Sequence, residues 1–207
     1  MASVKAERAA QTRQALLLAA AEVFDEAGYE QAAVTRIVER AGFTLGALYF
    51  HFGSKQGVAK ALMNAQPATI EPHLESTGLQ RLVDITIVWA DRMGRDPILR
   101  AGVRLAIEQG SHGMNDATSF EEWRTLMRSH LEVARDYGEL RDGACPDRLA
   151  RFVVGACTGI QVYSNLATNH ADLTERVCDM WDLLLPSVAS ESAMRSIEVG
   201  PVRVPNL

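Results

Sequence analysis

Apolar residues recur at helical spacing along almost the whole chain. Between residues 34 and 41 they stand at Val34, Ile37, Val38 and Ala41, the i, i+3, i+4, i+7 pattern of a helix with one buried face. No run of residues alternates β-branched and polar side chains in the way that a half-buried strand does. The pattern therefore predicts an all-α fold.

Glycine, proline and hydroxyl side chains mark the expected helix ends. A first helix should span about Ala6 to Ala27 and end at Gly28. Thr44 is a good N-cap for a short helix that ends near Phe52. The other helices are expected over about Val34–Ala41, Lys55–Ala65, Leu79–Gly94, Pro97–Gln109, Ser119–Tyr137, Pro146–Thr168 and Ala171–Ala189.

A break near residue 54 divides the chain into two expected domains. Residues 1–54 should form a three-helix head, and residues 55–191 a larger helical body. Residues 192–207 contain Pro201 and Pro205 and little periodicity, which predicts a flexible tail.

The head contains the pattern of a helix-turn-helix motif. A short amphipathic helix, a turn that begins at Gly42 and a second short helix form the arrangement that presents one helix to a DNA major groove. Leu48 and Phe52 should pack inward, and Phe50 is also interpreted as a core residue. The alternative is that residues 49–52 form only an aromatic core cluster. The predicted DNA-binding residues are Thr35, Arg36, Thr44, Leu45, Gly46, Tyr49, His51 and Lys55.

The predicted DNA-binding residues suit phosphate and base contacts for different reasons. The Thr44 hydroxyl can cap its helix and donate to a phosphate, and Gly46 lets the backbone approach DNA closely. Tyr49 offers a phenolic hydroxyl and His51 a ring nitrogen. Lys55 adds a positive charge at the start of the next helix, where phosphate binding is favourable.

Charge and composition change this picture only slightly. The formal net charge is −5, yet residues 1–60 hold seven Lys and Arg against six Asp and Glu, which suits an anionic partner at the head. A chance excess of basic residues on a solvent-exposed face gives similar counts.

The three cysteines have no C-x-x-C spacing, and neither a metal site nor a cofactor is expected. No apolar stretch approaches the ~20 residues that cross a bilayer, so no membrane partner is expected.

A family resemblance is carried by residues 43–55, FTLGALYFHFGSK, which look like the signature of the TetR (tetracycline-repressor-like) family of bacterial transcriptional repressors. Arg13 and residues 19–29 resemble that family's first helix. The resemblance implies an all-helical homodimer whose two DNA-binding heads meet a palindromic operator in double-stranded DNA, with a ligand-binding body behind them.

Two positions depart from the family pattern. Ala33 stands where members usually have a Thr that caps the second helix, and losing such a cap costs ~1 kcal/mol. Leu45 stands where a Lys usually follows the Thr, so an apolar side chain replaces a phosphate or guanine contact. Leu45 can instead touch a thymine methyl group.

The body resembles the γ-butyrolactone-receptor branch of the same family. The matching segments are LRAGVRL at residues 99–105, FEEW at residues 120–123 and GACTGIQV at residues 155–162. The branch implies a small, diffusible γ-butyrolactone-like inducer, with quorum sensing and secondary metabolism as its setting.

Such a ligand needs an apolar cavity with a few polar contacts. The branch implies Trp123, Thr158 and Gln66 as ligand contacts. Phe120 is added because it shares the face of Trp123, and Gln161 because it is polar within an apolar run. The alternatives are that Trp123 is plain core and that the Thr158 hydroxyl bonds back to the preceding helical turn.

The last two long helices are expected to form the interface with a second copy. If they do not, their apolar face packs only within its own subunit. The residues assigned to this face are Leu166, Leu173, Val177, Met180, Trp181, Leu184 and Leu185.

These observations predict a cytoplasmic, ligand-responsive transcriptional repressor, associated with the nucleoid when it is bound to DNA. Ligand binding should tilt the fourth helix and move the two heads out of register. One rival is a receptor-like regulator that answers a different metabolite, such as an antibiotic intermediate, or no ligand. A dimerising module without DNA is a second rival. No phosphate loop, metal-binding motif or nucleophile elbow supports an enzyme.

Overall fold

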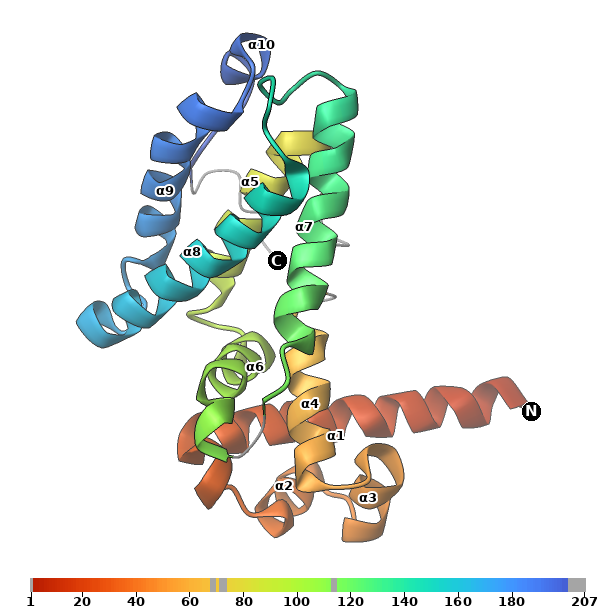
Figure 1. Cartoon of the computed structure of the whole chain (residues 1–207). Helices are drawn as coiled ribbons and strands as arrows, with labels where there is room; N and C mark the ends of the chain where they lie inside the picture. The colour runs from red at the N-terminus through yellow and green to blue at the C-terminus, as the bar shows by residue number, and fades with distance from the viewer. Residues whose placement is uncertain (1, 68–69, 71–73, 113–114, 201–207) are drawn as a thin grey trace. The chain divides into compact units, whose positions relative to one another are not determined.

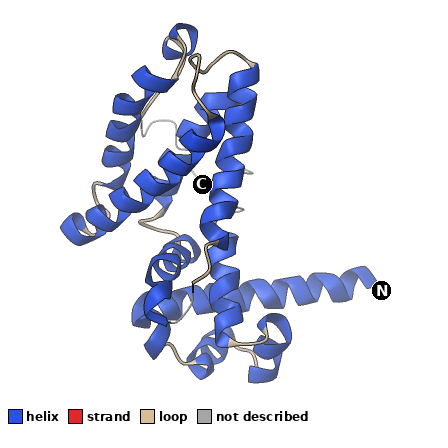
Figure 2. Cartoon of the chain, in the orientation of Figure 1, coloured by secondary structure: helices blue, strands red, loops and turns tan. Residues whose placement is uncertain are grey.

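The computed structural model describes residues 2–67, 70, 74–112 and 115–200. In this part of the chain every regular element is a helix, apart from one isolated bridge between Leu140 and Ala189 (Figure 2). The predicted all-α fold is confirmed. Within the same residues, no helix combines the length and the apolar character that crossing a membrane requires.

The helices follow one another as Figure 1 shows. They are α1 (Ala2–Gln31), α2 (Val34–Ala41), α3 (Leu45–Phe52), α4 (Lys55–Ala65), α5 (Gly78–Arg92), α6 (Pro97–Glu108), the 3-10 helix η3 (Gln109–His112), α7 (Thr118–Asp136), α8 (Pro146–Thr168), α9 (Leu173–Val188) and α10 (Glu191–Met194).

Helix ends agree well with the periodicity and the capping residues. From α2 to α9, every expected boundary lies within two residues of the observed one. α1 begins earlier than expected, at Ala2, and its regular part is interrupted at Gly28, where φ is 71° and ψ is 173°. A short helical stretch then continues to Gln31. Glycine tolerates this positive φ without the strain that a Cβ would introduce.

The segment expected to be a flexible tail is tied to the rest of its unit as far as Glu198. It begins inside α10, whose N-cap Ser190 accepts a hydrogen bond from the amide of Ala193 at 3.3 Å. Farther on, the Glu198 amide donates to Oε1 of Gln80 at 2.9 Å, and Nε2 of Gln80 donates to the Glu198 carbonyl at 3.0 Å. Because these backbone groups have partners on α5, the expectation of a loose segment is wrong for residues 192–198. Residues 201–207 lie outside the described part.

The chain forms two compact units. The first contains Met1–Thr69 and Asp96–Ser119, and the second contains Ile70–Arg95 and Phe120–Leu207. α4 and α6 therefore belong to the same unit as the three helices of the expected head, although both lie beyond residue 54.

The first unit is held together by one apolar core and by two arginines of α6. Arg100 donates through Nε to Oδ2 of Asp25 at 2.7 Å, and Arg104 donates through Nη1 to the Asp25 carbonyl at 2.8 Å. These bonds attach α6 to the C-terminal part of α1. The core side chains include Leu16, Ala20 and Phe24 of α1, Ile37 of α2, Leu48 of α3, Leu62 of α4 and Leu99 of α6, none more than 1% exposed.

The second unit is centred on α5, which is buried along most of its length. One face of α9 packs into this core, and Nε1 of Trp181 donates to Oγ1 of Thr86 on α5 at 2.6 Å. Leu173, Val177, Trp181 and Leu185 are at most 4% exposed. Assigning these four residues to an interface between copies is therefore wrong, because they already cover their own core.

Candidate DNA interface and ligand-contact residues

The helix-turn-helix forms where the glycine and threonine signals placed it. α2 ends at Gly42, which adopts the left-handed conformation with φ 70° and ψ 30°. Glycine adopts this conformation more readily than residues with a Cβ, and it turns the chain sharply after α2. Thr44 then caps α3 by accepting a hydrogen bond from the Ala47 amide at 3.2 Å. The two short helices are thus fixed by local chemistry at both sides of the turn.

α3 has one buried side and one exposed side. Leu48 is fully buried, with 0% exposure, where α3 packs against α1 and α2. Leu45 and Tyr49 are 39% and 48% exposed, and Gly46 is exposed as well. The N-terminal part of α3 therefore presents three of the predicted DNA-binding residues to solvent, and the alternative of a purely structural aromatic cluster is wrong for Tyr49.

Phe50 is the clearest departure from the sequence-based interpretation. Its side chain is 82% exposed, so its assignment to the core is wrong. At about 100° per residue it lies roughly 160° around α3 from Leu48, on the opposite side of the helix. Phe52 lies closer to the buried side, is half-buried, and is covered by the guanidinium of Arg13 at 5.1 Å from the ring centroid. Helical periodicity alone would have assigned Phe50 to the exposed side of α3 and Phe52 to the buried side.

The cationic side chains of α2 are held by carboxylates of α1. Arg36 and Arg40 both form ion pairs with Glu26, and Arg40 also lies 3.5 Å from Glu22. The hydrogen bond from Arg40 is the largest cause that lowers the pKa of Glu26, followed by the positive charges of Arg40 and Arg36. Arg36 and Thr35 remain exposed. The sequence gives no signal for the role of Glu26, because its partners lie ten and fourteen residues away.

Lys55 and His51 lie at the C-terminal side of the motif. Nζ of Lys55 donates to the Glu30 carbonyl at 3.2 Å and stands 4.7 Å from the ring centroid of Tyr29. Burial lowers the pKa of Lys55. The lysine therefore fastens the start of α4 to the end of α1. His51 is partly exposed, and its ring meets the Phe50 ring edge-on with centroids 5.1 Å apart.

The missing cap of α2 leads to a first prediction. Ala33 has the extended backbone of an N-cap, with φ −84° and ψ 133°, but supplies no side-chain hydrogen bond. We expect Ala33→Thr to stabilise the protein by ~1 kcal/mol, because its hydroxyl can accept from a free amide of the first turn. Thermal unfolding should then shift upward by about 2–4 °C. Ala33→Val, which has the same shape without the oxygen, is the control, and an equal shift with valine would contradict the capping explanation.

The predicted ligand-contact residues do not all lie in one unit. Gln66 belongs to the first unit, where it is 2% exposed and donates through Nε2 to the Met63 carbonyl at 3.0 Å. The other four, Phe120 and Trp123 on α7 and Thr158 and Gln161 on α8, belong to the second unit. Trp123 is 9% exposed and Phe120 is half-buried.

Thr158 and Gln161 differ in how their polar atoms are satisfied. The Thr158 hydroxyl donates to the Val154 carbonyl at 2.8 Å, which is the bond to the preceding turn named above as the alternative. Gln161 is only 5% exposed, and its Oε1 has no hydrogen-bond partner. A buried acceptor without a partner costs free energy. Gln161 is therefore the predicted ligand contact with a buried acceptor oxygen available for a ligand donor.

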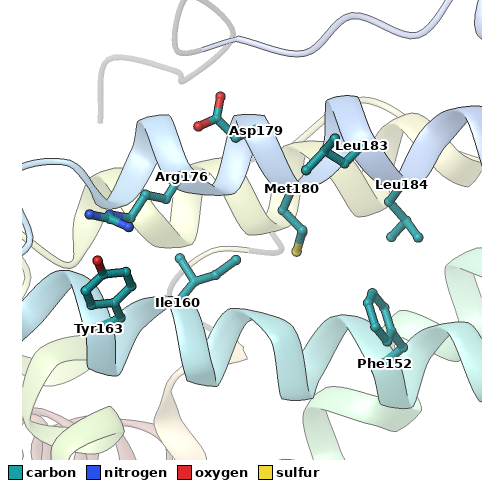
Figure 3. A pocket seen from close by; sticks show the side chains of 8 residues that line it. All are labelled: Phe152, Ile160, Tyr163, Arg176, Asp179, Met180, Leu183 and Leu184. Atoms are coloured by element: carbon teal, nitrogen blue, oxygen red, sulfur yellow. The ribbon is translucent and has the colours of Figure 1, made fainter.

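A groove of about 450 Å³ runs between α8 and α9 in the second unit. Figure 3 shows side chains of both helices lining it, with Met180 and Leu184 of α9 directed toward Ile160 and Phe152 of α8. At one end the guanidinium of Arg176 lies 4.4 Å from the ring centroid of Tyr163. None of the five predicted ligand-contact residues lines this groove. Within the described residues, no group of three or more His, Cys, Asp or Glu side chains is placed to hold a metal ion.

Comparison with known proteins places this geometry in a family. Residues 16–62 match the model for bacterial regulatory proteins of the tetR family, and residues 76–189 match a tetracyclin repressor-like C-terminal domain. The A-factor receptor protein of Streptomyces griseus is 38% identical over 198 residues, which cover 94% of this chain and 70% of that protein.

Two solved structures extend the likeness to the fold. The crystal structure of full-length native TylP, a TetR regulator from Streptomyces fradiae, has a TM-score of 0.88 at 40% identity and covers 95% of both chains. A γ-butyrolactone receptor described as ArpA-like has a TM-score of 0.65 at 28% identity, covering 91% of this chain and 94% of that one. The two matched regions and these relatives agree with the helix-turn-helix seen in the structure. The chain therefore belongs to the tetR family of bacterial regulatory proteins, which are DNA-binding transcription factors rather than enzymes.

Proposed function

We propose that this protein is a ligand-responsive repressor that binds a palindromic operator as a homodimer and is released by a small γ-butyrolactone-like signal. The observation that carries the proposal is the exposed N-terminal side of α3, capped by Thr44 and held against α2 by the buried Leu48. A recognition helix held in this way reads base edges with its first residues. The similarity to the A-factor receptor supports the choice of signal.

Two copies are needed because one helix-turn-helix contacts too few bases for strong specificity. A two-fold dimer places two identical heads on two half-sites of an inverted repeat. The exposed apolar surface of α8 and α9 supplies a face for the second copy. It includes Phe152, Tyr163 and Leu166 of α8, at 56%, 62% and 80% exposure, and Leu183 of α9 at 81%.

Release by ligand requires tighter ligand binding to the state that cannot bind DNA. α6 offers a physical route for this coupling, since Arg100 and Arg104 attach it to Asp25 of α1. The chain enters α6 from the second unit at Arg95 and returns to that unit at Phe120. Because α6 belongs to the unit that carries α3, a ligand-induced change in the second unit would reach that unit through the two chain connections on either side of α6.

The proposal is tested by selecting bound fragments from random double-stranded DNA and then titrating the complex with synthetic γ-butyrolactones. We expect an inverted repeat to be enriched, and saturating ligand to weaken its binding about 5- to 150-fold. Recovery of no common sequence would overturn the DNA-binding part. Ligand binding seen by calorimetry with unchanged operator affinity would overturn the release part.

A second candidate is a regulator of the same kind that answers a different metabolite. The observation in its favour is the Thr158 hydroxyl, which is already bonded to the Val154 carbonyl and does not need a ligand carbonyl as its partner. In that case the operator is selected as before, the butyrolactones have no effect, and an organic extract of an actinomycete culture releases the DNA.

Gln161 provides a prediction about the ligand site. We expect Gln161→Leu to raise the concentration of butyrolactone needed for release about two- to tenfold, because the variant loses an acceptor for a ligand hydroxyl. The same variant should be as stable as the parent or more stable by about 1 kcal/mol, because an unpartnered buried oxygen is removed. Operator release and thermal unfolding measure the two effects. An unchanged response of the Gln161 variant would exclude this side chain as a ligand contact.

A further inference from the structure

The exposed side of α3 is unusually apolar for a surface that binds DNA. Phe50 is 82% exposed and Leu45 is 39% exposed, and Gly46 between them carries no side chain. A group of large apolar side chains that stays exposed to solvent marks a surface that meets another molecule.

The polar groups around these two residues are largely engaged within the protein. Thr44 Oγ1 accepts from the Ala47 amide, and Lys55 donates to the Glu30 carbonyl. Arg36 is paired with Glu26. Apart from the exposed Thr35 and the partly exposed His51, donors and acceptors that read base edges are therefore scarce around Leu45 and Phe50, and the Tyr49 hydroxyl lies between these two residues.

The major groove contains one apolar group that distinguishes bases, the 5-methyl group of thymine. We propose that Leu45 and Phe50 determine operator specificity by contacting thymine methyl groups. This inference rests on the proposed function, since it requires α3 to enter the major groove. Methyl contact replaces the hydrogen-bonded readout that an arginine or lysine would provide at the same positions.

The helix geometry indicates how the two contacts are spaced. Leu45 and Phe50 are five residues apart, which is about 7.5 Å along the axis of α3 and about 140° around it. They stand at the two edges of the exposed side, with Gly46 and Tyr49 between them. B-DNA rises 3.4 Å per base pair, so the axial separation alone corresponds to about two base pairs, and the rotation of about 140° separates the two side chains further. The two methyl groups should therefore belong to non-adjacent thymines of each half-site.

The test replaces each thymine of the selected operator by deoxyuridine, which removes the methyl group and keeps every hydrogen-bonding atom. We expect two positions in each half-site to be sensitive. Removing one methyl group should lower the affinity about fourfold, and removing the methyl group at the same position of both half-sites should lower it about fifteenfold. Leu45→Ala should abolish the loss at one position and Phe50→Ala at the other. Both side chains are exposed, so the variants should fold.

Tyr49→Phe is the matched control on the same side of α3. It should weaken binding to the thymine and the deoxyuridine operator by the same factor, leaving their ratio unchanged. The inference is overturned if deoxyuridine at every thymine changes the affinity by less than twofold. It also falls if both alanine variants keep the parent's sensitivity. These failures leave operator binding intact, whereas the absence of any bound operator would overturn the proposed function and this inference together.

Discussion

Replacing Gly57 by alanine should weaken operator binding at least about tenfold while leaving the second unit folded. A Cβ at this position would stand 1.9 Å from the Phe52 carbonyl oxygen and 3.0 Å from its carbon. The atom it meets is backbone at the last residue of α3, so no side-chain rotation relieves the contact. α4 would have to move away from α3, although the Gly57 amide is bound to Ser54 Oγ at 3.0 Å and Val58 is fully buried.

We expect this variant to lose about 1–3 kcal/mol of stability, as overpacked sites typically do, and to bind the operator at least about tenfold more weakly. Equilibrium unfolding and operator titration measure the two effects. Gln56→Ala is the control, because it also places alanine in the first turn of α4 but on an exposed position. Inducer binding in calorimetry should persist, because four of the five predicted ligand contacts lie in the second unit, which the substitution does not touch. An alanine variant with parental operator affinity would show that the corner between α3 and α4 does not position the recognition helix.

The elements that the sequence predicts well are those set by local chemistry. The periodicity of residues 34–41, the positive φ of Gly42 and the Thr44 cap all act within a few residues, and the helix-turn-helix follows from them. The role of Gly57 was not predictable in this way. The sequence shows only a glycine within a helix. It does not show that the Phe52 carbonyl comes close to this glycine, because that approach arises only where α3 and α4 meet at a corner.

Contacts between residues distant in the chain account for most of the other differences. Glu26 holds Arg36 and Arg40, and Asp25 holds α6, through pairings that no spacing rule connects. Phe50 is a different case, because its aromatic side chain favours a core position whereas its place on the helix does not. Periodicity alone places it opposite Leu48, on the exposed side where it is found.

α9 shows why an apolar stripe does not by itself identify an interface. The helix carries two such stripes. One contains Val177 and Trp181 and faces its own core, and the other contains Met180, Leu183 and Leu184 and lines the groove with α8. Sequence spacing detects both stripes but does not say which of them meets a second copy.

Gly155 and Gly159 of α8 carry the second large prediction. Both glycines are exposed, and a Cβ at either position would meet no atom within 4 Å. Glycine inside a helix is less favourable than alanine by about 1 kcal/mol, so two of them on one exposed face are not explained by the stability of a single copy. They are explained if a helix of a second copy approaches α8 closely between Phe152 and Tyr163.

We therefore expect Gly159→Phe to separate the proposed dimer into folded single copies. The parent should sediment at about 45 kDa, twice the 22.7 kDa of one chain, and the variant at the mass of one chain. Operator affinity should fall by about a hundredfold or more, because the second head no longer benefits from the first one being bound. Sedimentation and operator titration measure both effects.

Two controls separate this explanation from a general effect of an added ring. Gly159→Ala should leave each copy as stable or more stable, since the Cβ has space and alanine favours the helix. Thr125→Phe places the same ring on an exposed position of α7 and should remain dimeric. If Gly159→Phe stays dimeric and keeps its operator affinity, the exposed surface of α8 and α9 is not the interface. The exposed Leu166 and Leu183 would then need another partner.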